Sequence, residues 1–186
     1  TIDNNGLFTA GRTAGTYTIR ATSGKATGTA SVYISDFNNT NLATGKNAWA
    51  SSIQYNTFNA LKANDGFIGS RFSPKTNANE WWYVDLEDMY LIDRLVIRWM
   101  KTVVGKDFNI EFSADGREWQ EIYRTTTQPT DLIFDDSEVD SNGHTVNQAI
   151  QTIDIDHIGA RFVRINLNHA QGDYQSSFWE FEVYGE

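Results

Sequence analysis

The chain has 186 residues, of which 40% are hydrophobic and 13% aromatic. This is enough apolar surface for a folded core, and the composition is unlike that of a disordered tail. The formal net charge of −9 argues against nucleic acid or an anionic membrane as the partner. The chain lacks cysteine, which excludes disulfides and thiolate metal sites, and no apolar run approaches the ~20 residues of a membrane span.

The first predicted elements form a hairpin. Residues 16–22 and 29–34 alternate with period two, and the turn-forming residues 23–25 separate them. A polar cluster over residues 35–41 follows and marks a boundary. An isolated hairpin is marginally stable in water, so we expect this segment to pack on another surface. Residues 42–186 suit one sandwich domain.

Further short strands are predicted downstream, and no stretch keeps a 3.6-residue period over a helix-like length. Residues 114–117 lie between two alternating segments and predict a tight hairpin turn. The polar stretch 131–147 predicts a long surface loop. Many short strands with frequent turns indicate an antiparallel sandwich or barrel. The alternating segments are residues 95–100, 108–112, 163–167 and 181–183.

The first segment carries a resemblance of its own. Residues 2–11 (IDNNGLFTAG) and 14–19 (AGTYTI) resemble the C-terminal part of a bacterial Ig-like (BIG) domain. Such modules act as spacers in secreted and surface proteins. The resemblance implies a partial Ig-like hairpin over residues 1–35 and a linker over 36–41. Because the chain begins at Thr1 without Met, we expect it to belong to a longer protein with covalently linked catalytic or surface domains.

Residues 42–186 resemble F5/8 type C (discoidin-like) domains, in particular the family-32-like carbohydrate-binding modules of bacterial polysaccharide-degrading enzymes. The resemblance implies an all-β, antiparallel jelly-roll sandwich of the galactose-binding-like kind. It also implies a secreted or cell-surface bacterial protein whose partner is a polysaccharide or oligosaccharide. The motifs occur in the family's order and are residues 41–46 (NLATGK), 80–86 (EWWYVDL), 113–119 (SADGREW), 160–165 (ARFVRI) and 179–185 (WEFEVYG).

Residues 62–70 (KANDGFIGS) resemble the calcium loop of this family. The residues alone leave a simpler alternative open, in which Asp65-Gly66 is a turn and Glu180 a solvated edge residue. The family pattern instead implies one structural Ca²⁺ ion, which prefers six to eight oxygen ligands. The implied ligands are the carboxylates of Asp65 and Glu180, the carbonyls of Lys62, Phe67 and Trp179, and the carbonyl and hydroxyl of Ser70.

A sugar site needs an aromatic platform and polar groups that meet hydroxyls. The resemblance places it on loops at one end of the sandwich. Tyr174 is the expected platform, beside Gln175 and Asp173. Met100, Lys101 and Thr102 are expected to form a second wall, and Arg71, Ser73, Lys75 and Asn79 to line a third loop. Trp49 is either another platform or a cover for the junction with residues 1–35.

Galactose-binding relatives commonly use a His and an Arg on these loops. The matching positions here are Ser73 and Met100, so galactose specificity is not carried over. A β-glucan or another polysaccharide is an equal alternative.

Catalysis is not expected. His144, His157 and His169 lack the H-E-x-x-H spacing, and neither a G-x-S-x-G elbow nor a phosphate loop is present. The prediction is therefore a non-catalytic carbohydrate-binding module. The alternative is an adhesion domain that binds a protein or a cell-surface partner. The acidic chain has no obvious apolar spike loop, which weighs against membrane binding.

Overall fold

The computed structural model describes residues 15–34, 40–170 and 174–186. The chain divides into two compact units, Thr1–Asn39 and Thr40–Glu186, at a point inside the predicted linker 36–41. In the first unit, β1 (Gly15–Ser23) pairs antiparallel with β2 (Ala26–Ile34). The turn contains Gly24 at φ 58°, a conformation that glycine adopts without strain. The hairpin is confirmed, whereas residues 2–11 of the Ig-like resemblance lie outside the described residues.

Two long strands shared by two layers build the second unit. The pairing of β4 (Glu80–Met100) with β8 (Gln148–Ala170) shifts register between Asp85 and Tyr90. On one side of this shift, β4 pairs with β3 (Ala48–Ala50), and β8 continues the sheet to β5 (Gly105–Ser113) and β6 (Gln120–Thr125). On the other side, β4 pairs with β9 (Phe178–Gly185), and β8 with β7 (Ile133–Asp135). The expected antiparallel sandwich is therefore confirmed.

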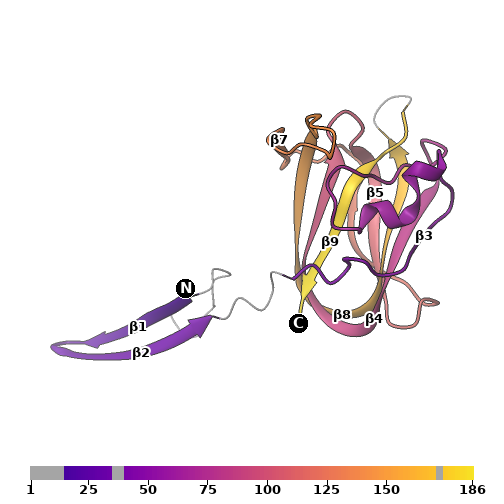
Figure 1. Cartoon of the computed structure of the whole chain (residues 1–186). Helices are drawn as coiled ribbons and strands as arrows, with labels where there is room; N and C mark the ends of the chain where they lie inside the picture. The colour runs from indigo at the N-terminus through magenta and orange to yellow at the C-terminus, as the bar shows by residue number, and fades with distance from the viewer. Residues whose placement is uncertain (1–14, 35–39, 171–173) are drawn as a thin grey trace. The chain divides into compact units, whose positions relative to one another are not determined.

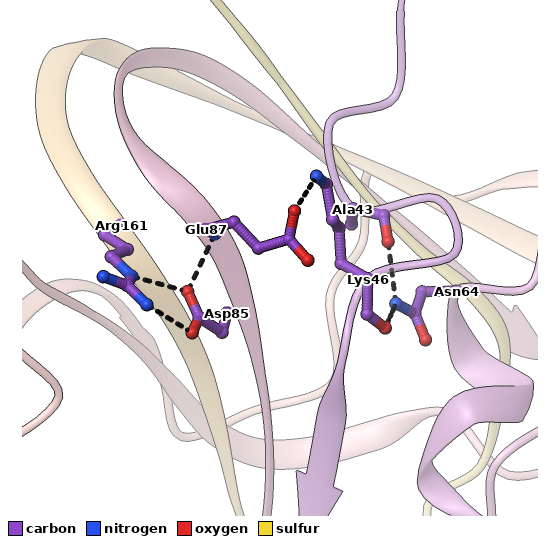
Figure 2. Close-up of polar contacts among 6 residues, drawn as sticks. All are labelled: Ala43, Lys46, Asn64, Asp85, Glu87 and Arg161. Carbon is purple, nitrogen blue, oxygen red and sulfur yellow. Dashed lines mark hydrogen bonds and ion pairs between the residues drawn. The ribbon is translucent and has the colours of Figure 1, made fainter.

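The two long strands bend at a corner, where they pass from one layer to the other (Figure 1). Glu87 and His157 both adopt positive φ there, 73° and 47°. The Arg161 guanidinium donates to both Asp85 oxygens, at 2.7 and 2.8 Å, and the Glu87 amide donates to Asp85 Oδ1 at 2.8 Å. Figure 2 shows this network together with the Lys46–Glu87 ion pair. Charge-assisted, bidentate contacts of this kind hold the bend in one geometry.

The core lies between the layers and follows the predicted period of two. The predicted inward series is confirmed, with the buried side chains Leu95, Ile97, Trp99, Phe108, Ile110, Phe112, Val163, Ile165, Leu167, Phe181 and Val183. The family resemblance implies a core or hairpin aromatic at Trp81, but Trp82 is the fully buried residue and Trp81 is only partly buried. Trp81 lies on the opposite face of β4 and stacks on Tyr83, with ring centroids 5.5 Å apart. Adjacent tryptophans in a strand point to opposite faces, so only one of them can enter the core.

The connections between strands also match in part. The predicted turn at 114–117 joins β5 to β6, and the Asp115 carboxylate accepts hydrogen bonds from the amides of Arg117 and Glu118. The predicted loop 131–147 is not wholly irregular, because it contains β7. Two 3₁₀ helices, η2 (Asn56–Phe58) and η3 (Ala60–Ala63), lie between β3 and β4. Among the described residues, no helix is long and apolar enough to cross a membrane.

Candidate functional site

A cavity of about 390 Å³ lies where the end of β4 meets the segment that precedes β9. The start of β9 lies at the end of the sandwich opposite the corner (Figure 1). The structure brings together six of the residues predicted to line the sugar site, which come from segments far apart in the sequence. The lining residues are Gln54, Arg71, Ser73, Met100, Thr102, Val103, Tyr174 and Gln175.

A short bridge between Phe72 and Phe178 positions the cavity walls. The Phe72 amide donates to the Phe178 carbonyl at 2.9 Å, and the reciprocal bond is 3.3 Å long. The Phe178 ring packs in the core against Phe72 and Trp99, with centroids 5.2 and 5.7 Å apart. The Met100 amide donates to the Ser177 carbonyl at 2.9 Å. Backbone hydrogen bonds and aromatic packing therefore hold three separate segments of the cavity in place.

The lining combines an exposed aromatic ring with polar groups. Tyr174 is 70% exposed, so one face of its ring is open for stacking. Gln175 donates from Nε2 to the Lys75 carbonyl at 3.1 Å, which leaves its side-chain oxygen free to accept. Ser73 and Met100, the two positions where galactose-binding relatives commonly carry His and Arg, both line the cavity. The arrangement can hold a small polar ligand against an aromatic face.

The remaining candidates are not among the lining residues. Lys101 forms an ion pair with Asp136 at 2.7 Å. Asn79 lies in the turn before β4 at φ 57°. Trp49 is 44% exposed but lies on β3, where it stacks on Tyr83 with centroids 5.1 Å apart. Asp173 lies outside the described residues.

Sequence reasoning missed two lining residues, Gln54 and Val103. Gln54 reaches the cavity because its amide donates to the Ser73 carbonyl at 2.9 Å, and Val103 because its carbonyl accepts from the Ser177 amide at 3.2 Å. Both contacts join segments distant in sequence, and no local pattern marks either residue.

A second cluster of polar side chains surrounds Asp65, which precedes the lining residue Arg71 in the chain. The Asp65 carboxylate accepts hydrogen bonds from Ser70 Oγ at 2.7 Å, Lys62 Nζ at 3.0 Å and the Phe67 amide at 3.0 Å. Burial opposes ionisation of Asp65, but these hydrogen bonds outweigh it, so the net effect lowers its pKa. Figure 2 shows the preceding residue, Asn64, anchored by donation to the carbonyls of Ala43 and Lys46, at 2.7 and 2.9 Å. The loop is thus fixed around an ionised carboxylate.

Glu180 on β9 faces this cluster from the other end of the domain's sequence. Its side chain is 4% exposed, and neither carboxylate oxygen has a hydrogen-bond partner among the described residues. Burial, reinforced by the nearby Asp65 carboxylate, raises the pKa of Glu180 to about 8. The neighbouring Trp179 donates from Nε1 to the Asn147 carbonyl at 3.1 Å. The predicted residues Asp65 and Glu180 therefore meet in space.

The two carboxylates fit a calcium ion on physical grounds. A buried carboxylate without a partner is unfavourable, and a cation shared with Asp65 would satisfy it. In the described part of the chain, no group of three or more His, Asp or Glu side chains could hold a metal. Calcium also accepts carbonyl and hydroxyl oxygens, so the carbonyls of Lys62, Phe67 and Trp179 and both oxygens of Ser70 would complete the ligand set. Lys62 contacts Asp65 through its ammonium group in the structure, and the role of its carbonyl as a ligand stays a prediction.

The sandwich, with a cavity at the loop end and an acidic cluster on the same stretches of chain, defines a small β-sandwich module. The F5/8 type C domain family matches residues 47–181, and the chain belongs to this family. No curated protein sequence matches the chain significantly.

Solved structures agree with this assignment. Two chitosan-binding modules of a chitosanase/glucanase from Paenibacillus sp. IK-5 are similar to the chain. Module 1 is 28% identical, covers 79% of this chain and 100% of its own, and gives a TM-score of 0.64. Module 2, solved with chitotriose, is 29% identical. The match covers 78% of this chain and 100% of the module, with a TM-score of 0.65. A family 32 module from C. perfringens, solved with galactose, is 17% identical. The match covers 74% of this chain and 92% of the module, with a TM-score of 0.58, and it supports the fold alone.

Proposed function

We propose that residues 42–186 form a non-catalytic carbohydrate-binding module that directs linked domains of a secreted or cell-surface bacterial protein to glycans. The observation that carries this proposal is the cavity, in which the exposed Tyr174 ring lies among polar side chains. The similar Paenibacillus modules are described as chitosan-binding, and one was solved with chitotriose, which supports a sugar ligand of some kind. An adhesion role is the alternative if no glycan binds.

The binding mode follows from the lining chemistry. The C–H face of a sugar ring would stack on Tyr174, which removes apolar surface from water on both sides. Gln54 and Gln175 would exchange hydrogen bonds with the sugar hydroxyls, since each amide both donates and accepts. A few polar groups around an aromatic platform set the orientation of the ligand and leave the rest of the glycan in solvent.

Affinity electrophoresis on a panel of soluble glycans tests this proposal. We expect at least one glycan to retard the protein, and Tyr174→Ala to weaken that binding by about tenfold, which corresponds to about 1.4 kcal/mol. Trp49→Ala is the matched control, because it removes an exposed aromatic that does not line the cavity. Equal weakening by both substitutions, with unchanged melting temperatures, would contradict the proposed site. Absence of retardation by every glycan would favour adhesion.

We further propose that one structural calcium ion links the loop over residues 62–70 to β9. Its ligands would be Asp65 and Glu180 through their carboxylates, Ser70, and the carbonyls of Lys62, Phe67 and Trp179. Bound calcium supplies positive charge that neutralises the two carboxylates. The proposal is supported by the unpartnered oxygens of Glu180 and by the fixed loop around Asp65. The ion would act on stability and would not contact the sugar.

A further inference from the structure

The cavity differs in charge from the molecule that contains it. The chain carries 24 acidic and 15 basic residues. Yet the described lining of the cavity contains one charged side chain, the cation Arg71, and no carboxylate. A pocket with low-dielectric walls concentrates the field of such a charge, so the ligand meets a positive centre on an otherwise negative protein.

Contacts on two sides hold Arg71 in place. Its Nη1 donates to Ser177 Oγ at 2.6 Å, and Ser177 Oγ in turn donates to the Phe72 carbonyl at 2.5 Å. The guanidinium carbon lies 3.9 Å from the centroid of the Phe58 ring. A guanidinium has five N–H donors in a rigid plane, and the hydrogen bond to Ser177 uses one of its groups. The remaining edge of the fork can therefore bind a ligand oxygen pair.

Arg71 also lacks the counter-charge that other arginines of the sandwich have. Arg98, Arg161 and Arg164 pair with Glu182, Asp85 and Glu111. Within the described residues, no carboxylate lies within ion-pair distance of Arg71. Burial lowers the pKa of Arg71 from its ordinary value, but an arginine remains charged at neutral pH. A desolvated, unpaired guanidinium gains most from an anionic ligand.

A second cation lies next to the same wall. Lys75 is exposed, and its carbonyl accepts the hydrogen bond of the lining residue Gln175. No carboxylate of the described chain lies within ion-pair distance of its ammonium group. Lys75 can thus add a longer-range attraction at the rim, screened by salt, to the direct contact that Arg71 offers.

From this arrangement we propose that the cavity selects glycans that carry an anionic group, either a uronic acid carboxylate or a sulfate ester, and that Arg71 is the residue that binds the anion. This inference rests on the proposed carbohydrate-binding function and refines its ligand class. Glycans with a cationic amino group, such as chitosan, are disfavoured by the same charge. The specificity therefore differs from that of the structurally similar Paenibacillus modules.

Matched polymer pairs test the proposal by affinity electrophoresis or calorimetry. Polygalacturonate and its fully methyl-esterified form differ in the carboxylate, and dextran sulfate and dextran differ in the sulfate. We expect about tenfold or tighter binding of the anionic member of one pair, and the pair that responds identifies the anion. Raising NaCl from about 0.05 to about 0.5 M should reduce this preference. Chitosan should bind no better than a neutral polymer.

Arg71→Gln should abolish the preference, whereas Arg71→Lys should retain part of it, because lysine keeps the charge without the bidentate fork. Arg117→Gln is the charge-matched control on the β5–β6 turn, away from the cavity lining, and should leave the preference unchanged. Thermal unfolding of each variant establishes that it folds, and Arg71→Lys keeps the test decisive if Arg71→Gln does not.

Equal affinity for the members of both pairs, with neutral glycans bound, would overturn this inference and leave the proposed function intact. A preference that survives Arg71→Gln, or that falls equally in Arg117→Gln, would also overturn the role of Arg71. Failure to bind any polymer would overturn the proposed function itself.

Discussion

The cavity and the acidic cluster share two stretches of chain yet have opposite character. Asp65 and Arg71 belong to one stretch, and Tyr174 and Glu180 to the other. The Phe72–Phe178 bridge joins these two stretches, which carry both the cavity with the cation Arg71 in its lining and the carboxylates Asp65 and Glu180. Residues close together in the chain can therefore serve different chemistry.

The difference in burial has an energetic consequence. Tyr174 is largely exposed, so its loss removes little from the core, whereas Glu180 is buried and its state is coupled to folding. Substitutions in the cavity should thus change ligand affinity, and substitutions in the acidic cluster should change stability. The predictions below are ordered by the size of the expected effect.

We expect the largest effect from Phe178→Ala, because Phe178 belongs to the bridge that joins the two stretches carrying both sites. Its ring contacts the rings of Phe72, Trp82, Trp99 and Phe181, so truncation leaves a cavity at the centre of the aromatic core. We expect a loss of about 3–5 kcal/mol in the free energy of unfolding, measured by denaturant titration. Both glycan binding and the response to calcium should decline together. A stable variant with one site intact would show that the bridge does not join them.

Calcium should affect the acidic cluster and leave the cavity unchanged. At a calcium concentration of about 100 times its Kd, we expect stabilisation of about 2.7 kcal/mol, lost on addition of excess chelator and followed by thermal unfolding. Glu180→Gln should abolish the calcium response. Without calcium it should raise the melting temperature above that of the wild type at neutral pH, because the raised pKa of Glu180 means that folding must protonate this buried group, and glutamine removes that cost. Tyr174→Ala is the control and should keep the full response. An unchanged melting temperature, with no calcium found in the protein, would refute the metal site.

Glu80, a buried carboxylate at the start of β4, should give a smaller, pH-dependent effect. Glu80 accepts hydrogen bonds from the hydroxyls of Ser51, Ser52 and Thr76, and Ser52 also accepts from the Lys75 amide. Burial acts to raise the pKa of Glu80, but these hydrogen bonds outweigh it and lower the pKa below its ordinary value of 4.5. The stabilisation is therefore complete above pH 4.5 and is lost as the pH falls through the lowered pKa.

We expect Glu80→Gln to cost about 1–3 kcal/mol at neutral pH, because a neutral amide cannot accept all of these hydrogen bonds. The difference from the wild type should shrink in acid, as measured by denaturant unfolding between pH 7 and the acid transition. Glu87→Gln, at an exposed position, is the control and should cost less. A constant difference at all pH values would argue against ionised Glu80 as the source of the stability.

Local patterns predicted much of this protein from the sequence. Period-two alternation identified the strands and most of the core, because a strand with one buried face must alternate. Family motifs brought Asp65 and Glu180 together as a pair. The family pattern indicated Trp81 as a core or hairpin aromatic, although two adjacent aromatics fit either register. In the structure, the face of β4 that carries Trp82 packs in the core.

Only the tertiary structure decided which loops meet at the cavity. Arg71 and its partner Ser177 are 106 residues apart, and that contact depends on the Phe72–Phe178 bridge. Lys101 and Trp49 were also candidates in the sequence but are absent from the lining. Lys101 pairs with Asp136, and Trp49 lies on β3, where it stacks on Tyr83. The chemistry of each residue is thus a property of the sequence. Which residues share a site is determined by long-range strand pairing, which has no local pattern.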